Sequence, residues 1–204
     1  SGAQVGLFDA DVYGPSLPTM VQPLNPNLTM KKDLILPIEH GGVQLMSFGF
    51  TQNARDEEAP AMMRGPMVSQ VIHQLLTGTD WGELDYLVLD LPPGTGDIQL
   101  ALGQLVSITA SVLVTTPQHI SFIDVVKGVR MFDTLNVPTV AVVENMSTFQ
   151  CSNCDTAHAI FGQGAMKRLV SEFGFEHTFQ LPIDPTLAPS CDSGVPHVIR
   201  HPNS

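Results

Sequence analysis

The sequence is poor in cationic side chains, in cysteine and in long apolar runs. Only 9 of its 204 residues are Lys or Arg, against 20 Asp and Glu, so the formal net charge is -11. This balance argues against a surface that binds nucleic acid or an anionic membrane nonspecifically. No apolar run approaches the ~20 residues of a transmembrane helix. No signal peptide opens the chain, which begins at Ser1 as a fragment would. We therefore expect no nucleic-acid partner and no membrane partner.

The three cysteines are too few, and odd in number, for the disulfide framework of a small secreted protein. Cys151 and Cys154 form a CxxC pair, which lets one loop present two sulfur atoms to a metal. The pair fits a metal cluster, a zinc site completed by His158, or a redox-active or inert dithiol. Cys191 stands alone beside Asp192, and we expect it to be a bystander.

Hydrophobic residues make up 43% of the chain and charged residues 14%, which is typical of a globular domain. Short apolar runs alternate with amphipathic helical patterns of ten to fifteen residues. This alternation predicts an α/β fold, a doubly wound and mostly parallel sheet with right-handed crossovers. The predicted strands lie at residues 5–8, 86–89, 110–116, 139–144 and 178–181, and the predicted helices at 66–78, 98–106, 121–135 and 166–173.

Several local features accompany this framework. The run at 86–89 is continuously apolar, which predicts a strand buried on both faces, and 110–116 is predicted to be the next buried strand. Asp97 is placed to cap the helix that follows it. A β-hairpin is predicted with strands 34–36 and 43–46, residues 17–33 are expected to be irregular, and 51–60 are expected to form a mobile loop.

Two of the predicted strands end in acidic residues. Asp9 and Asp11 follow the first strand, and Asp90 ends the strand at 86–89. Both ends lead into loops rich in Gly and Pro. Ligands of open α/β sheets bind beyond the carboxyl ends of the strands, where carboxylates can hold a metal and sense phosphate. The alternative is that these aspartates only cap strand ends and form turns.

Five motifs occur in a characteristic order along nearly the whole chain. They are FDADVYGPSLP (8–18), RGPMV (64–68), DLPPGTGD (90–97), VENMS (143–147) and CSNC (151–154). Together they resemble the Mrp/ApbC family of P-loop ATPases that carry iron–sulfur clusters. The stretches VYGPSLPTM (12–20) and GDIQLAL (96–102) also look like its plastid high-chlorophyll-fluorescence branch. The resemblance implies one P-loop NTPase-like domain of the MinD/NifH type over residues 1–204.

One hallmark of the family is absent. The deviant Walker A loop, GKGGVGKS/T, does not occur, and none of the four lysines follows a Gly-rich loop. In the family this loop precedes the segment that matches Ser1. We therefore expect that the first strand, the P-loop and the first helix have been cut away, and that a C-terminal helix is also missing. Neighbouring strands would lose ladder partners. These residues alone should fold poorly and should neither bind nor hydrolyse ATP normally.

The resemblance assigns roles to residues at the acidic strand ends. Asp11 matches the switch I aspartate, which orients or activates the water that attacks the γ-phosphate. Asp9 matches the preceding acidic position, which supports the metal and its waters. Asp90 matches the Walker B-like position and would hold Mg²⁺ through water. Gly94 would let the switch II backbone approach the γ-phosphate and move after hydrolysis.

Other matches concern the nucleotide base. Asn145 matches the position that reads adenine, since a carboxamide can both donate and accept at one base edge. Its alternative role is to form a turn after a strand. The loop at Pro182 would form the second wall of the base pocket. Arg64 would contact nucleotide or a second subunit, or would be a surface residue beside a helix.

For Cys151 and Cys154 the resemblance implies one [4Fe–4S] cluster bridging the two subunits of a homodimer. The function implied is ATP-dependent transfer of that cluster to apo iron–sulfur proteins. The cofactors implied are ATP, Mg²⁺ and the cluster, and both bacterial cytoplasm and an organelle, plastid or mitochondrion, fit. A MinD/ParA-type positioning ATPase and a non-catalytic metal scaffold are the alternatives.

Overall fold

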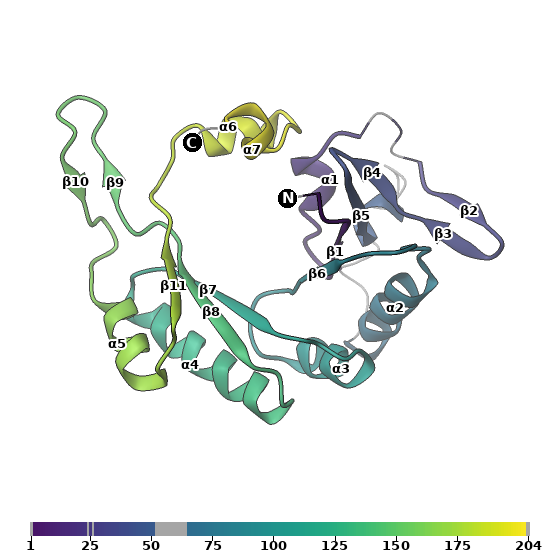
Figure 1. Cartoon of the computed structure of the whole chain (residues 1–204), viewed down its shortest axis with the longest axis horizontal. Coiled ribbons are helices and arrows are strands. Elements are labelled where there is room, and N and C mark those ends of the chain that lie inside the picture. Colours follow the sequence, from purple (N-terminus) through teal and green to yellow (C-terminus); the bar gives the residue numbers. More distant parts are fainter. Residues whose placement is uncertain (1, 24, 26, 52–64, 203–204) are drawn as a thin grey trace. The chain divides into compact units, whose positions relative to one another are not determined.

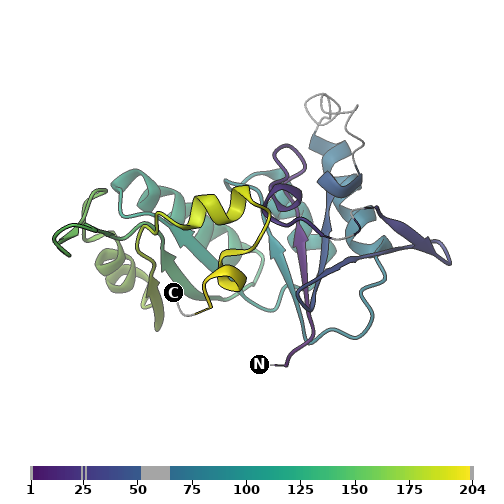
Figure 2. The ribbon, with the colours of Figure 1, turned by 90° about the horizontal axis from the view of Figure 1, so that it is seen from above.

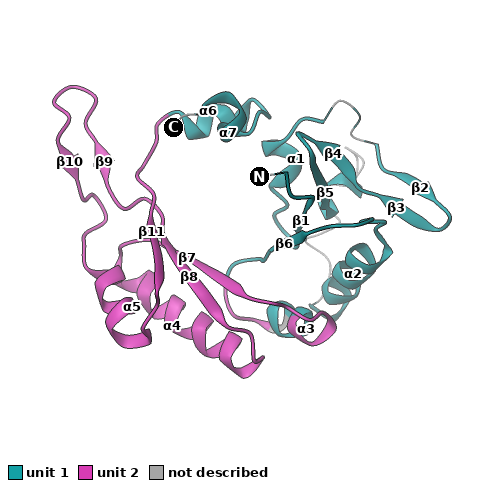
Figure 3. Cartoon of the chain, viewed as in Figure 1, with its two compact units in different colours: residues 1–93, 97–102, 186–204 teal, residues 94–96, 103–185 magenta. Residues whose placement is uncertain are grey.

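The computed structural model describes residues 2–23, 25, 27–51 and 65–202. The chain forms two compact units (Figure 3). Unit 1 comprises residues 1–93, 97–102 and 186–204, and unit 2 comprises residues 94–96 and 103–185. Arg64 and most of the loop expected over 51–60 lie outside the described residues. Among the residues described, no helix is long and apolar enough to cross a membrane.

Unit 1 contains a four-stranded sheet in the order β4-β5-β1-β6 (Figure 1). β1 (Val5–Asp9) pairs in parallel with β5 (Val43–Ser47) on one side and with β6 (Tyr86–Asp90) on the other. β4 (Ile38–His40) is antiparallel to β5. The helices of this unit are α1 (Leu17–Met20), α2 (Gly65–Gly78), α6 (Leu187–Asp192) and α7 (His197–Arg200), with a 3₁₀ turn, η1, at Phe48–Thr51.

The predicted β-hairpin exists, but its first strand was assigned wrongly. The turn at Gly41 and Gly42 joins β4 to β5, and both glycines have positive φ, as a tight hairpin turn requires. β3 (Leu34–Leu36) pairs instead with β2 (Thr29–Lys31), in a second hairpin that projects from unit 1 (Figure 2). The irregular structure expected over residues 17–33 is therefore wrong in part, since this range contains both α1 and β2.

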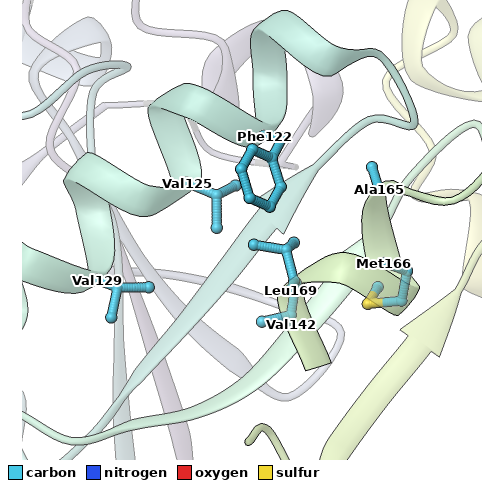
Figure 4. Close-up of a cluster of buried hydrophobic side chains, with 7 residues drawn as sticks. All are labelled: Phe122, Val125, Val129, Val142, Ala165, Met166 and Leu169. Carbon is cyan, nitrogen blue, oxygen red and sulfur yellow. The ribbon is translucent and has the colours of Figure 1, made fainter. Parts of the chain in front are cut away.

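Unit 2 contains a three-stranded parallel sheet in the order β11-β8-β7. Its strands are β7 (Ser111–Thr115), β8 (Thr139–Glu144) and β11 (His177–Gln180). α4 (His119–Thr134) and α5 (Ala165–Phe173) pack on the sheet through an apolar core (Figure 4). The core residues are Phe122, Val125, Val129, Val142, Ala165, Met166 and Leu169. These elements confirm the predicted helices and strands to within two residues.

The predictions that β6 is buried on both faces and that β7 is a buried strand are both wrong. In the described residues β6 is the last strand of the unit 1 sheet, and β7 is the last strand of the unit 2 sheet. Val88 of β6 is 50% exposed and Val114 of β7 is 65% exposed. Both runs have the composition of central strands, yet each lacks a neighbour on one side.

Two further elements complete the fold. α3 (Asp97–Leu105) confirms the helix predicted after the β6 loop, while the capping side chain of Asp97 lies outside what the structure describes. A small antiparallel hairpin in unit 2 was not predicted at all. It consists of β9 (Phe149–Gln150) and β10 (Ala157–His158), and it extends away from the three-stranded sheet (Figure 1). The loop of this hairpin carries the CxxC pair.

Candidate functional site

The two acidic strand ends lie side by side in unit 1. Asp9 at the end of β1 is in register with Asp90 at the end of β6. The backbone N–H of Ala10 donates to the carbonyl oxygen of Asp90 at 2.9 Å, which continues the pairing one residue beyond the strands. The expectation that Asp9 and Asp90 share one edge of a parallel sheet is therefore confirmed.

Asp9 is buried, with only 3% of the residue exposed. Its carboxylate organises the loop after β1. Its Oδ1 accepts the N–H of Asp11 at 3.1 Å. Its Oδ2 accepts the Ser47 hydroxyl at 2.9 Å and the N–H of Leu17 at 3.3 Å. Ser47 Oγ in turn accepts the N–H of Gly49 at 3.1 Å. Asp9 thus joins the ends of β1 and β5 to the start of α1.

Removing the Asp9 carboxylate should destabilise unit 1 strongly. Asp9→Ala leaves the Ser47 hydroxyl without its acceptor in a buried site, and each such unsatisfied donor costs about 1–3 kcal/mol. We expect a loss of about 2–4 kcal/mol in the free energy of unfolding, measured by urea denaturation. Asp124→Ala is the matched control, because Asp124 pairs only with Lys127 at an exposed position. A loss for Asp9→Ala no larger than for the control would show that these hydrogen bonds are not structural.

Asp11 is less buried and shapes the next turn. Its Oδ1 accepts the backbone N–H groups of Tyr13 and Gly14, each at 3.1 Å. This is the turn-forming role that the sequence analysis kept as the alternative. The bonds fix the carboxylate in a loop at the carboxyl edge of the sheet, which is where open α/β sheets bind their ligands.

The electrostatics of this edge favour a bound cation. Partial burial, followed by the charges of Asp9 and Asp11, raises the pKa of the Asp90 carboxyl above its ordinary value. The raised pKa means that the ionised form of Asp90 is disfavoured beside its acidic neighbours. A divalent cation at this edge would reverse the effect, because its charge favours all three carboxylates in their ionised form. Mg²⁺ prefers oxygen ligands and retained water, and these carboxylates offer oxygen atoms, but among the described residues no group of three His, Cys, Asp or Glu side chains is gathered for a metal.

The loop after β6 carries two features of the candidate switch II. Gly94 has φ of +97°, a conformation that an L side chain rarely adopts, and nothing lies within 4 Å of where a Cβ would stand. Gln99, buried in α3, donates through Nε2 to the carbonyl oxygen of Pro92 at 2.8 Å. This bond ties the start of the loop to the helix that follows.

In unit 2, Asn145 and Pro182 lie on two loops that are bonded to each other. Asn145 follows β8, and its Oδ1 accepts the N–H of Met146 at 3.0 Å. Pro182 follows β11 and is exposed. The N–H of Leu181 donates to the carbonyl oxygen of Glu144 at 3.0 Å, so the two loops start together. The arrangement brings together the residues that the sequence analysis assigned to the base pocket.

The CxxC pair occupies the tip of the β9–β10 hairpin. The N–H of Cys151 donates to the carbonyl oxygen of Thr156 at 3.0 Å, and the N–H of Asp155 donates to the carbonyl oxygen of Cys151 at 2.9 Å. These bonds, with Asp155 in the left-handed region at φ of 54°, close a tight turn. All three cysteines are free thiols, and Cys154 is exposed. A short rigid loop therefore presents two thiols near the surface.

Local hydrogen bonds favour the thiolate form of Cys154. Its Sγ lies 3.3 Å from Thr156 Oγ1 in hydrogen-bonding geometry. Hydrogen bonding to the Thr156 side chain, then to its backbone, and then to the Cys151 thiol lowers the pKa of Cys154. The thiolate is the form that binds metals. Among the residues that the structure describes, no group of three His, Cys, Asp or Glu side chains is gathered for a metal, so His158 does not complete a zinc site here.

Sequence reasoning missed three positions that hold these segments. Ser47 bonds the Asp9 carboxylate from 38 residues away, Gln99 holds the β6 loop, and Ser147 holds the loop after β8. No motif assigns a role to any of the three residues. For Gln99 and Ser147 the sequence does offer a signal, because each is a polar residue within or just after one of the five motifs. For Ser47 only the pairing of β5 with β1 reveals the contact.

Comparison with known proteins settles the family. A family model described as the NUBPL iron-transfer P-loop NTPase, of the ParA group, matches residues 1–204. The chain belongs to this family. The fold is accordingly the α/β P-loop NTPase fold, as the sequence predicted.

Named relatives and solved structures agree with this placement. The chloroplastic Fe-S cluster assembly factor HCF101 of Arabidopsis thaliana is 58% identical over 205 residues, which is 100% of this chain and 37% of the relative. An iron-sulfur cluster carrier protein of Pseudomonas fragi is 45% identical, over 100% of this chain and 70% of its own length. The chain thus spans little more than a third of its plant relative. The relatives include chloroplastic, mitochondrial and bacterial proteins, as expected from the sequence.

Among solved structures, a nucleotide-binding protein of Archaeoglobus fulgidus in complex with ADP superposes with a TM-score of 0.79. It is 31% identical, and the match spans 95% of this chain and 74% of that protein. The cell division ATPase MinD of Pyrococcus furiosus superposes with a TM-score of 0.62 at 16% identity, over 100% and 80% of the two chains. The second match shows a shared fold alone.

Proposed function

We propose that this chain belongs to an ATP-dependent carrier that binds a [4Fe–4S] cluster at a homodimer interface and delivers it to apo iron–sulfur proteins. The observation that carries the proposal is the hairpin tip, where Cys151 and Cys154 are free, near the surface and held by the same tight turn. Family membership and the names of the relatives support it.

The number of ligands favours a shared cluster. A [4Fe–4S] cluster takes four thiolates, and one hairpin offers two. No third ligand is gathered beside them in the described part of the chain. A second copy of the chain, related by a two-fold axis, would supply the other two thiolates. A cluster held this way at exposed hairpin tips would be accessible to an acceptor protein, as a cargo must be.

The carboxyl edge of unit 1 would serve the nucleotide. Asp90 would hold Mg²⁺ through water, and Asp9 would support the metal indirectly by fixing the loop around it. Asp11 would orient the attacking water, which is how a carboxylate near the γ-phosphate contributes to hydrolysis. Gly94 would let the switch II backbone follow the presence or loss of that phosphate. Mg²⁺, when bound, would neutralise charge on the phosphates.

Unit 2 would bind the base and the cargo. The Asn145 carboxamide offers both a donor and an acceptor to a base edge, and Pro182 would form the opposite wall. Asn145, Pro182 and the cysteine hairpin all belong to unit 2, which supports this division of roles.

Transfer of the cluster tests this function directly. The natural full-length protein, reconstituted anaerobically with iron and sulfide, should restore the visible absorbance and activity of an apo [4Fe–4S] enzyme faster than free iron and sulfide do. The Cys151→Ala/Cys154→Ala variant should give only the rate of free iron and sulfide. Equal rates for the two proteins would contradict the proposal. Repeating the reaction with ATP and with a non-hydrolysable analogue shows whether hydrolysis contributes.

A further inference from the structure

The loop after β8 and the loop after β11 are joined by a continuous series of hydrogen bonds. Both donors of Ser147 point to one acceptor, because its N–H and its hydroxyl donate to the carbonyl oxygen of Leu181 at 2.9 and 3.1 Å. The N–H of Ile183 then donates to the carbonyl oxygen of Thr148 at 2.7 Å. Phe149 and Ile183 form a parallel β-bridge. Residues 147–149 and 181–183 therefore form a short parallel ladder, named here the loop ladder.

The loop ladder leads directly into the cysteine hairpin. Phe149 bridges to Ile183 on one side and, as the first residue of β9, pairs with His158 of β10 on the other. Cys151 comes two residues later. The orientation of the hairpin is thus set by the residue that ends the ladder, and any shift of the ladder moves the base of the hairpin with it.

The other end of the loop ladder begins at the candidate base-reading residue. Between Asn145 and Ser147 stands Met146, whose φ of 56° lies in the left-handed region. This conformation is disfavoured for a residue with a Cβ. The Asn145 side chain stabilises it locally, since Oδ1 accepts the Met146 N–H at 3.0 Å. A base edge that donates to the same oxygen competes with this bond.

We propose that the loop ladder couples occupancy of the base pocket to the exposure and metal affinity of Cys151 and Cys154, with Ser147 as its positioning residue. The inference rests on the proposed function, because it requires that Asn145 reads a base. When the Asn145 carboxamide turns to the base, Met146 loses its local partner and can leave the left-handed region. The ladder then shifts and carries the hairpin with it. The coupling lies within unit 2 and needs no change of subunit arrangement.

Coupling between two binding sites is reciprocal, and this reciprocity can be measured. If nucleotide changes the properties of the cysteine pair by a given factor, metal on the cysteine pair changes nucleotide affinity by the same factor. Coupling free energies between sites in proteins commonly correspond to factors of about 5–150. A structural role of Ser147 alone would affect stability without giving this reciprocity.

The test is the alkylation rate of each cysteine in the metal-free natural full-length protein, with iodoacetamide as the probe and peptide mass spectrometry as the readout. Saturating ATP or ADP should change the rates at Cys151 and Cys154 by at least about 5-fold. Cys191 lies on α6 in unit 1 and serves as the internal reference. Its rate should stay constant.

Two variants weaken the loop ladder in different ways. Ser147→Ala removes the hydroxyl that donates to Leu181, and Ile183→Pro removes the N–H that donates to Thr148. In either variant the nucleotide effect on Cys154 should fall below about 2-fold. In Ser147→Ala, which leaves Asn145 and the loop at Pro182 unaltered in sequence, nucleotide affinity should change by less than about 10-fold, since one neutral hydrogen bond contributes about 0.5–1.5 kcal/mol. Ser171→Ala is the matched control, because it removes an exposed hydroxyl bonded to Arg168 in the same unit.

The outcomes separate this inference from the proposed function. Nucleotide that binds in equilibrium dialysis but leaves the rates at Cys151 and Cys154 unchanged overturns the coupling and leaves the carrier function standing. Failure to bind nucleotide at all overturns both. A full nucleotide effect that survives in a folded Ser147→Ala or Ile183→Pro protein overturns the route through the loop ladder.

Discussion

Replacing Cys151 and Cys154 together by alanine should abolish binding of iron and sulfide. The two thiols are the cysteine ligands of the hairpin tip, and the lowered pKa of Cys154 favours its thiolate, the form that binds metals. After anaerobic reconstitution, the natural full-length protein should hold about two iron and two sulfide per polypeptide, as one four-iron cluster shared by two chains requires. The double variant should hold none above background. Iron and acid-labile sulfide assays, with visible absorbance, measure the difference.

The third cysteine supplies the control for this result. Cys191 lies on α6, in the other compact unit, and Cys191→Ala should keep the full content of iron and sulfide. The double variant should also keep the parent's far-ultraviolet circular dichroism, because the hairpin bonds at this turn are made by backbone groups. Iron retained by the double variant would mean that the cluster, or another metal, binds elsewhere. Loss of iron from Cys191→Ala would call for a different ligand set.

ATP hydrolysis should depend on a P-loop that the 204 residues do not contain. The chain alone should show no Mg²⁺-dependent ATPase activity, because it lacks the Gly-rich backbone and lysine that cradle the phosphates in this class. Fusing a segment that carries the family's GKGGVGKS/T loop ahead of Ser1 should give measurable turnover. In that fusion Asp11→Asn should lower kcat at least about 100-fold, as expected when a group that orients the nucleophile is lost.

The thermal stability of the same fusion provides a second test, which does not depend on catalysis. β6 and β7 each end a sheet in the described residues, and each leaves large apolar side chains exposed. Full burial of one such side chain contributes about 1.5–3 kcal/mol, and 1 kcal/mol corresponds to about 2–4 °C in Tm at this chain length. We expect the fusion to raise Tm by at least about 5 °C. Measurable ATPase activity of the unfused chain would contradict this interpretation, as would a fusion that folds but gains neither stability nor activity.

Much of the framework could be predicted from the sequence, because local patterns determine it. The helical spacing of Val68, Ile72 and Leu75 and the apolar run of β8 each indicate one structure without help from distant residues. The shared edge of Asp9 and Asp90 could also be predicted, because parallel strands bring their carboxyl ends together. These features depend on periodicity and topology.

The remainder depended on contacts that no local pattern records. β9 and β10 are two residues long, too short to show a period, so the hairpin that carries the cysteines was missed. β3 was assigned to the wrong hairpin because its sequence suits either partner. The burial of β6 was overestimated because an apolar composition shows only that a strand can be buried. It does not show which strands lie beside it. The buried bond from Ser47 to Asp9 depends on strand pairing across 38 residues.

The central claim is one cluster held by two copies of this chain, and native mass spectrometry of the anaerobically reconstituted protein tests it most directly. The account predicts a species with the mass of two polypeptides plus one [4Fe–4S] unit, which disappears for the Cys151→Ala/Cys154→Ala variant. A single polypeptide carrying one zinc ion, or a dimer of unchanged abundance that carries no iron, would contradict it.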